Sequence, residues 1–296
     1  MGLLSKEIEA HYAEGREAAR LRTGLGELER VRTEAILARY LPPPPAVVLD
    51  VGGAAGVYAI PLAKKGYKVE LIDPMELHVA QALEAAKAAG VSLKARVGDA
   101  RKLDGESSSA DSRNPRAESA GADARSLRAE SGSTDAVLLL GPLYHLVERG
   151  DRILALREAL RVLKPRGVLF AAGISRYASL IDGVASDLIA DPAFREIIDG
   201  DLATGKHQNP TNHPTYFTTA FFHKPEELCE EVYEAGFGAV QVLAVEGPIW
   251  SAGGFEKAWA DPAQREKLLE YLEKTEREPS LQGASAHLLA VARRPE

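Results

Sequence analysis

Three acidic residues each end a short apolar run of the sequence. These are Asp50, Asp73 and Asp99. If the runs are neighbouring parallel strands, their carboxyl ends meet at one edge of a sheet, where α/β folds bind ligands. Carboxylates accept hydrogen bonds from hydroxyl and amino groups. Asp73 could also cap the next helix, with Pro74 as its first residue. Helix capping alone hardly explains why three strands in a row end in an acid. Together the three acids predict a ligand site.

A turn of small residues follows the first of these acids. Gly52, Gly53, Ala54 and Gly56 come directly after the expected strand 47–51. Small residues there let backbone N–H groups approach a ligand closely. The spacing at 52, 54 and 56 differs from the G-x-G-x-x-G fingerprint of dinucleotide sites. It resembles motif I of class I S-adenosylmethionine-dependent methyltransferases, with Ala54 in place of the usual middle glycine, so the turn must keep φ negative there or accept a small strain.

The resemblance implies S-adenosylmethionine as the cofactor and S-adenosylhomocysteine as its product. It places Asp73 at the ribose, where the carboxylate accepts hydrogen bonds from both hydroxyls. It also implies that Asp99 bonds the adenine amino group and that Ala100 offers a backbone N–H to the ring. The residues expected to hold the cofactor are Asp50, Gly52, Gly53, Ala54, Gly56, Asp73, Pro74, Asp99, Ala100, Leu140 and Gly141.

The resemblance continues after the third acid. Residues 135–140 are expected to form the fourth strand, whose exit 141–146 reads Gly-Pro-Leu-Tyr-His-Leu at the edge of the reaction site. Residues 152–163 have the apolar spacing of a helix. Pro165 should stop this helix, and Gly167 should permit a left-handed turn into the next strand.

Together these elements predict an α/β fold with a doubly wound, mostly parallel, seven-stranded Rossmann-like sheet over about residues 47–296. The remaining strands are expected at 168–172, 240–245 and 287–292. The expected organisation is an N-terminal helical lid over 1–45, a cofactor-binding core over 46–175, a substrate cap inserted over 176–222, and completion of the core sheet by 223–296.

Within the core, residues 105–134 form a polar segment with a tandem repeat. Residues 110–121 align with residues 122–133 at a period of twelve, and seven positions match. The segment is too polar to build a core and is expected to be a loop without stable structure. We infer that the loop after the third strand was duplicated, so deleting residues 110–133 should leave cofactor binding intact.

Two regions are available for the methyl acceptor. Tyr12, Arg16 and Arg20 lie about one helical turn apart before the first strand, where related enzymes fold a leading helix over the cofactor; they could also form a solvated helix face. Tyr177 and Tyr216 belong to the insertion, whose aromatic, histidine and amide side chains favour a cap over an aromatic-walled pocket. The histidines of the insertion match no standard metal-binding motif, so no metal is expected.

Methyl transfer by in-line displacement requires an acceptor aligned with the S–CH3 bond and the exclusion of water. An acceptor atom that carries a proton also needs a base, and histidine is the usual choice near neutral pH. His145 is the first candidate because it follows the fourth strand at the methyl-donor edge, with Tyr144 beside it. His213, Tyr216 and His223 are the alternatives, and His145 could instead be a packing residue.

The sequence also limits the acceptor. The Asn/Asp-Pro-Pro-Tyr turn of enzymes that methylate nucleobase amino groups does not follow the fourth strand, and the net charge of -7 disfavours nucleic acid. The resemblance is broadly to stand-alone bacterial enzymes of the ubiquinone/menaquinone and small-molecule type, which implies a small, partly apolar acceptor. Two alternatives stay open: a nicotinamide-dependent oxidoreductase, which the glycine spacing disfavours, and a non-catalytic S-adenosylmethionine-binding module.

The composition indicates the size of the core and the cell compartment of the protein. Of 296 residues 45% are hydrophobic, which suffices for a sizeable core. The single cysteine, Cys229, excludes an intrachain disulfide and a Cys-rich zinc site. Without a signal sequence or an apolar run of about 18 residues, a cytoplasmic protein that does not contact membranes is expected. The oligomeric state is not indicated.

Overall fold

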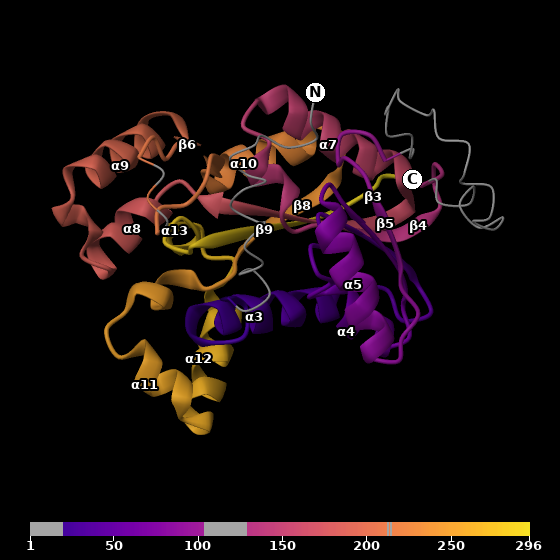
Figure 1. The fold of residues 1–296 in the computed structure, drawn as a ribbon, viewed down its shortest axis with the longest axis horizontal. Helices are drawn as coiled ribbons and strands as arrows, with labels where there is room; N and C mark the ends of the chain where they lie inside the picture. The colour runs from indigo at the N-terminus through magenta and orange to yellow at the C-terminus, as the bar shows by residue number, and fades with distance from the viewer. Residues whose placement is uncertain (1–19, 104–128, 212, 214) are drawn as a thin grey trace.

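The structure is a computed structural model, and it describes residues 20–103, 129–211, 213 and 215–296. Tyr12 and Arg16 of the predicted lid, and most of the repeat segment, lie outside these residues. Figure 1 shows one central sheet with helices on both faces.

The central sheet contains the seven strands that the sequence predicts. Five of them run parallel in the order β3-β2-β1-β4-β5, and β9 pairs antiparallel with both β5 and β8. The doubly wound, mostly parallel sheet is therefore confirmed. The strands are β1 (Val47–Val51), β2 (Lys68–Asp73), β3 (Lys94–Val97), β4 (Thr134–Leu139), β5 (Leu163–Ser175), β8 (Gly238–Ala244) and β9 (His287–Arg293).

Two further short strands bring the described sheet to nine. β6 (Lys206–His207) and β7 (Ala220–His223) form an antiparallel pair, and β7 runs parallel to the end of β5. Neither is long enough to give a clear alternation of apolar and polar residues, which is why the sequence did not reveal them.

The turn into β5 differs from the prediction. The left-handed residue is Arg166, with φ 65°, and not Gly167. Gly167 is required for another reason, since a Cβ there would lie 2.8 Å from the backbone oxygen of Lys164. β5 begins directly after the helix, and its register with β4 shifts in this region.

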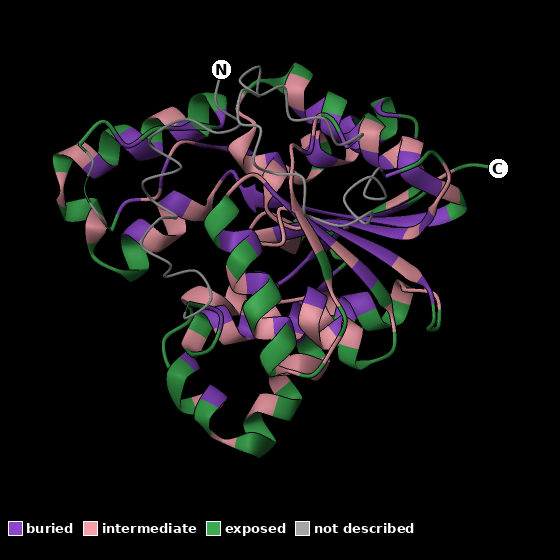
Figure 2. Cartoon of the chain, turned by 45° about the vertical axis from the view of Figure 1, so that its right-hand side comes forward, coloured by how far each residue is buried: buried purple, intermediate pink, exposed green. Residues whose placement is uncertain are grey.

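Each face of the sheet buries its own core. Along β1, Val48 packs with the helices of one face, whereas Leu49 and Val51 pack with those of the other. This alternation follows from the two-residue period of a strand, and the strands are buried in the centre of Figure 2. One face carries α3 (Gly24–Tyr40), α4 (Ala59–Lys64) and α5 (Glu76–Ala88), and the other carries α7 (Arg149–Val162) and α10 (Pro225–Glu234).

The leading helix α3 is fastened to the C-terminal part of the chain. The buried Arg32 donates through Nε to the backbone oxygen of Val245 (3.1 Å) and through Nη2 to Oε2 of Glu276 (2.6 Å). Arg39 donates to the same Glu276 oxygen. α3 is thus a fixed wall of the molecule.

The remaining helices follow the carboxyl ends of β4, β5 and β8, which lie at the same end of the sheet. The insertion supplies α8 (Ala178–Ala185), η2 (Leu188–Ala190) and α9 (Pro192–Thr204), and α6 (Pro142–His145) follows β4. No helix in the described part of the chain is both long and apolar enough to cross a membrane. Between β8 and β9 lie η3 (Gly247–Ser251), α11 (Phe255–Ala260), α12 (Pro262–Thr275) and α13 (Pro279–Gln282).

Candidate active site

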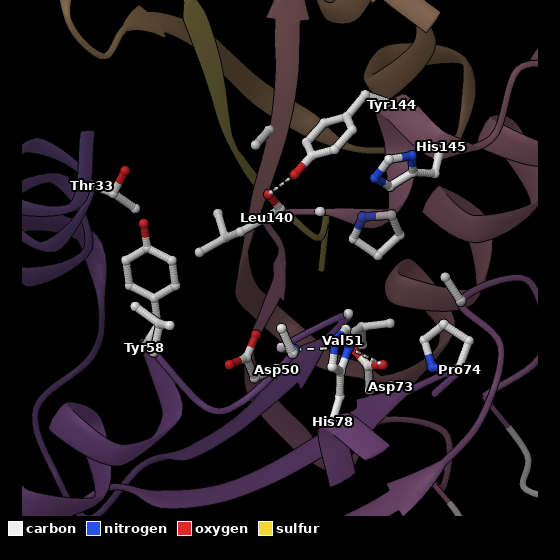
Figure 3. A pocket seen from close by; sticks show the side chains of 18 of the residues that line it. Thr33, Asp50, Val51, Tyr58, Asp73, Pro74, His78, Leu140, Tyr144 and His145 are labelled. Atoms are coloured by element: carbon white, nitrogen blue, oxygen red, sulfur yellow. Dashed lines mark hydrogen bonds and ion pairs between the residues drawn. The ribbon is translucent and has the colours of Figure 1, made fainter. Parts of the chain in front are cut away.

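A pocket lies at the carboxyl ends of β1, β2 and β4 (Figure 3). Of the residues predicted to hold the cofactor, only Gly56 does not line it. Gly56 has φ 83° and serves the turn itself, because a Cβ there would face Ile60 and Ala82. The predicted residues that the structure brings together in this pocket are Asp50, Gly52, Gly53, Ala54, Asp73, Pro74, Asp99, Ala100, Leu140 and Gly141.

Small residues in the turn after β1 are required by close contacts. A Cβ on Gly52 would lie 2.6 Å from Cγ of Pro142, and one on Gly53 would lie 2.7 Å from Oδ2 of Asp50. Ala54 adopts φ 45°, so the turn accepts the strain that the sequence left as one of two possibilities. The turn therefore stays narrow, as a close backbone approach to a ligand requires.

The Asp73 carboxylate is held from three sides. Its Oδ2 accepts the N–H of Ala54 at 2.9 Å, and its Oδ1 accepts the N–H of Met75 at 3.0 Å. Nδ1 of His78 lies 3.0 Å from Oδ1. The next helix begins at Glu76 with Met75 as its N-cap, so Pro74 is not its first residue.

Asp99 lies beyond β3 and is oriented by the residue two positions later. It accepts the backbone N–H of Arg101 at 2.8 Å and the Nη2 of the same residue at 2.7 Å. Arg101 also donates to Asp151 on α7. Nε of Arg101 also donates to both oxygens of Asp99, at 3.0 and 3.1 Å, so a ligand amino group would share these oxygens with Arg101.

Asp50 is a buried acid at the floor of the pocket. Burial, together with the nearby negative charge of Asp73, raises the pKa of Asp50 to about 7. Among the described residues its Oδ2 has no hydrogen-bond partner. A buried carboxylate in this state is stabilised by a positively charged ligand, so the residues present fit a cationic cofactor such as the predicted one.

The methyl-donor edge is formed by α6. Tyr144 and His145 both line the pocket, with ring centroids 4.7 Å apart. The Tyr144 hydroxyl donates to the backbone oxygen of Leu140 at 3.4 Å. Phe217 of the insertion stacks on His145 at 6.0 Å. The insertion thus supports these two side chains from behind.

The other predicted acceptor-side residues lie elsewhere. His223 is fully buried and its Nε2 contacts Glu231 of α10. His213 is exposed and stacks on Tyr216, whose hydroxyl donates to Asp191. Tyr177 packs near Gly283 and is likewise outside the pocket lining. Among the described lining residues none belongs to the segment 176–222, so the predicted cap supplies no wall of this pocket.

Arg20, the residue of the predicted lid that the structure describes, lines the pocket, and its Nη1 donates to Oε2 of Glu29 at 2.6 Å. Other lining residues carry no signal in the sequence. The Tyr58 hydroxyl points toward Thr33 at one side of the pocket (Figure 3). His287, at the start of β9, also belongs to the lining. These residues come from distant parts of the chain, and no local motif marks them.

The strand order, with β9 antiparallel beside β5, and the acids at three strand ends define the class I methyltransferase fold. Residues 25–242 match the family model described as a methyltransferase domain, and the chain belongs to this family. No curated protein was found to match the sequence.

Solved structures agree on the fold. An S-adenosylmethionine-dependent methyltransferase from Methanosarcina mazei has a TM-score of 0.54 at 15% identity, with 88% of this chain and 97% of that chain covered. A possible histamine N-methyltransferase from Thermotoga maritima has a TM-score of 0.51 at 19% identity, with 97% of both chains covered. An N-methyltransferase from Haemonchus contortus, solved with S-adenosylhomocysteine, has a TM-score of 0.51 at 17% identity and covers 90% of this chain and 53% of that one.

The family and the fold establish the reaction class. The chain is an S-adenosylmethionine-dependent methyltransferase of the class I type, as the sequence predicted. A specific likeness to the ubiquinone/menaquinone branch is not found among these matches. The methyl acceptor is not identified by them.

Proposed function

We propose that this protein methylates a small, partly apolar molecule inside the pocket formed by β1, β2, β4 and α6. The observation that carries the proposal is a buried, unpaired carboxylate oxygen on Asp50 in the same pocket as Asp73 and Asp99. This arrangement suits a ligand that carries positive charge, hydroxyl groups and an amino group. An oxidoreductase pocket for a nicotinamide dinucleotide would instead face negatively charged phosphates.

Each acid has its own proposed role. S-adenosylmethionine, when bound, supplies a methyl group on a positively charged sulfur that is already activated for transfer. Asp50 offsets the positive charge of the ligand, and its ionised form is favoured as a result. The Asp73 oxygens accept hydrogen bonds from the backbone N–H groups of Ala54 and Met75, and we assign them the ribose hydroxyls as further donors. Asp99 accepts the adenine amino group.

The acceptor is expected beyond Leu140, where the lining is largely apolar. Leu289, Val245 and Ala172 form this wall, together with Tyr144. Apolar walls exclude water and hold a ligand by burial of its surface. His145 is the proposed base for an acceptor that carries a proton, because it is the predicted base that lines the pocket.

The kind of methyl acceptor and the location of the protein in the cell stay predictions. The net charge of -7 leaves no broad positive charge for a nucleic acid, so we propose a free small molecule as the acceptor. A cytoplasmic location is proposed on the sequence alone.

Titration calorimetry with S-adenosylmethionine and S-adenosylhomocysteine tests the cofactor site. We expect micromolar binding, weakened about tenfold or more, equal to about 1.4 kcal/mol, by Asp73→Asn and by Asp99→Asn. Asp199→Asn, on the exposed face of α9, is the matched control and should bind as the wild type does. A folded wild type that binds neither compound, or that prefers a nicotinamide dinucleotide, would overturn the proposal.

A second experiment separates an enzyme from a non-catalytic binding module. Methyl turnover is measured on a panel of small apolar acceptors with wild type, His145→Gln and His145→Ala. Turnover by the wild type eliminates the binding module. If His145 is the base, both variants should lower kcat with little change in cofactor affinity.

A further inference from the structure

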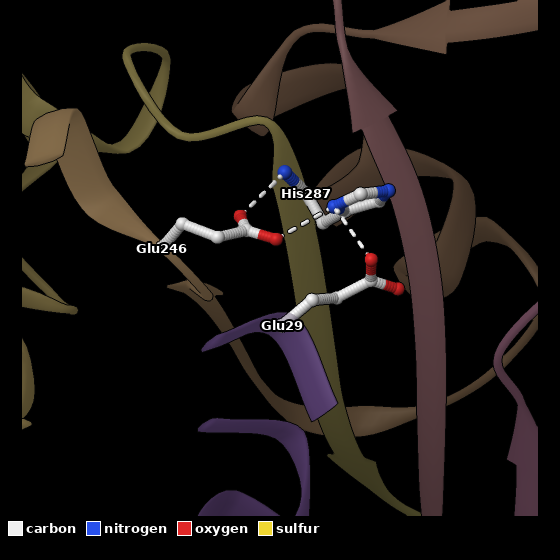
Figure 4. A group of neighbouring side chains, drawn as sticks. All are labelled: Glu29, Glu246 and His287. Carbon is white, nitrogen blue, oxygen red and sulfur yellow. Dashed lines mark hydrogen bonds and ion pairs between the residues drawn. The ribbon is translucent and has the colours of Figure 1, made fainter. Parts of the chain in front are cut away.

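His287 is held between two carboxylates at the acceptor side of the pocket (Figure 4). Its Nδ1 lies 2.7 Å from Oε1 of Glu246 and 3.8 Å from Oε2 of Glu29. Glu246 is itself 2% exposed and fixed, because its Oε2 accepts the Ser285 hydroxyl and the backbone N–H of His287, each at 2.9 Å. The imidazole orientation is therefore set by groups from α3, from the segment after β8 and from β9.

This arrangement determines which nitrogen of His287 carries a proton and which way its imidazole ring points. Carboxylates accept hydrogen bonds, so Nδ1 of His287 must carry a hydrogen. Burial alone would lower the pKa of His287, but the negative charges of Glu29 and Glu246 raise that pKa to about 9. The ring is then an imidazolium near neutral pH. Figure 4 shows that its second nitrogen, Nε2, points away from both carboxylates.

Arg20 is also charged and lies near His287, on the other side of Glu29. It donates to the same Glu29 oxygen that faces Nδ1. Because a guanidinium accepts no hydrogen bond, Arg20 cannot take the hydrogen of Nε2. Apolar pocket residues also lie beside His287: Leu289 follows on the same strand, and Ala172 is paired with Leu289 on the neighbouring β5. The other titratable residues that line the pocket are Asp50, Tyr58, Asp73, His78, Asp99, Tyr144 and His145.

The same three side chains could be considered as a metal site, because their ligand atoms lie within 4.8 Å of one another. Two observations argue against a cation. The Glu246 oxygen is already hydrogen-bonded to Nδ1, and the Glu29 oxygen already accepts from the Arg20 guanidinium. A metal ion would have to displace one proton and one positively charged side chain.

We propose that Nε2–H of His287 binds an anionic oxygen of the methyl acceptor, a carboxylate or an ionised phenol, at the apolar end of the pocket. An imidazolium has two donors, and Nδ1 of His287 is engaged by Glu246, so Nε2 is the donor that is left for a ligand in the pocket. An anionic oxygen supplies both the hydrogen bond and the opposite charge. This inference rests on the proposed function, and it narrows the acceptor to small apolar acids or phenols.

The test uses the full-length protein saturated with S-adenosylhomocysteine. Benzoate and 4-nitrophenolate are the anionic probes, and benzamide and benzyl alcohol are the matched neutral probes; calorimetry measures binding. We expect at least one anionic probe to bind about tenfold or more tightly than the neutral probes. His287→Asn should remove this preference, and Glu246→Gln should reduce it by lowering the charge on the ring. The stronger of the two anionic probes indicates the chemical type of the acceptor group.

Nitrogen NMR of the wild type gives a readout that does not depend on folding of a variant. The His287 Nε2 resonance should shift when an anionic probe is added and should not shift with benzamide. Equal binding of charged and neutral probes, no probe binding, or an unchanged Nε2 resonance would overturn the proposal. So would stoichiometric binding of Mn²⁺ that requires Glu246 and Glu29. If S-adenosylhomocysteine itself does not bind, the proposed function fails, and the same probe titrations without it still test His287 separately.

Discussion

At the scale of single residues, Asp50 should make the protein sensitive to pH. Its pKa is raised from 3.8 to about 7 in the folded protein, so the folded state holds this proton more tightly than the unfolded chain. Without cofactor, the contribution of Asp50 to stability should therefore be largest below about pH 4 and should be lost as the pH rises through about 7. Urea unfolding over this range, compared with Asp50→Asn, measures the contribution.

Cofactor affinity should show the opposite trend. A positively charged ligand favours the ionised Asp50, so affinity should increase by up to tenfold per pH unit below about pH 7 and then level off. Calorimetry at about pH 6, 7 and 8 measures this slope. An Asp50→Asn variant with the same slope as the wild type would show that another group is responsible.

Ala54 should report the strain in the turn after β1. Its φ of 45° costs about 1–2 kcal/mol for a residue with a Cβ, whereas a glycine loses about 0.4–1 kcal/mol through its more flexible unfolded chain. Ala54→Gly should therefore be neutral or stabilising by up to about 1.5 kcal/mol. Ala55→Gly is the control, because Ala55 does not have a positive φ and should only lose stability. Thermal unfolding of both variants should rank them in this order.

Much of the pocket at the strand ends could be predicted because its residues follow local rules. Asp50, Asp73 and Asp99 each end a strand, and the small residues occupy a fixed spacing in a turn. His287 and Glu29 could not be predicted in the same way, since they meet only when β9 and α3 pack together. The sequence placed His145 first but kept His223 as an alternative base, and the fold buries His223 away from the pocket.

At the scale of elements, a buried ionic network joins α7, β7 and α10. Glu231 accepts from Nη2 of Arg152 at 2.7 Å and lies 3.3 Å from Nε2 of His223. Burial alone would raise the pKa of Glu231, but His223 and Arg152 lower it to about 2. This contribution to stability should be present above about pH 4.5 and should be lost as the pH falls toward 2.

Removing one partner of this network should be costly. Glu231→Ala leaves the Arg152 charge buried and should lower the free energy of unfolding by about 3 kcal/mol. Glu230→Gln, at the exposed neighbouring position, should change it by less than about 0.5 kcal/mol. Urea unfolding measures both. Equal effects of the two substitutions would contradict a structural role for the network.

The elements themselves were mostly predictable, and their contacts were not. Strong apolar runs located the seven strands, and apolar spacing located the helix that became α7. The role of α3 is different, because it depends on the ion pair between Arg32 and Glu276, residues 244 positions apart. No periodicity in the sequence links two such residues, so the attachment of α3 to the C-terminal part of the chain could not be predicted.

At the scale of the whole molecule, the repeat segment offers a test of dispensability. The predicted loop extends too far, because residues 129–133 contact the core: Ala129 is buried in it, and the N–H groups of Gly132 and Ser133 donate to α7 backbone oxygens. Deleting residues 105–128 keeps these contacts. Deleting residues 110–133 removes the same length of chain and, by the repeat, substitutes Gly105 for Ala129 and Ser108 for Gly132.

Both deletions should retain cofactor binding, and their stabilities should differ. The deletion of residues 110–133 loses the buried Ala129 methyl group and places a serine at φ 66°. Each change should lower the free energy of unfolding by about 1 kcal/mol. The 105–128 deletion should unfold at nearly the wild-type temperature. Thermal unfolding with and without S-adenosylhomocysteine measures both quantities, and loss of cofactor binding in the 105–128 deletion would show that the segment is needed.

The position of β9 has a consequence for how the protein is made. β9 lies between β5 and β8, and it also carries His287 into the pocket. A ribosome produces the chain from its N-terminus, so β5 and β8 emerge before the strand that separates them. Until β9 follows, both strands have open edges on that side, and open edges invite pairing with other chains. A nascent or prematurely terminated chain should therefore depend on chaperones and should lack a complete acceptor pocket.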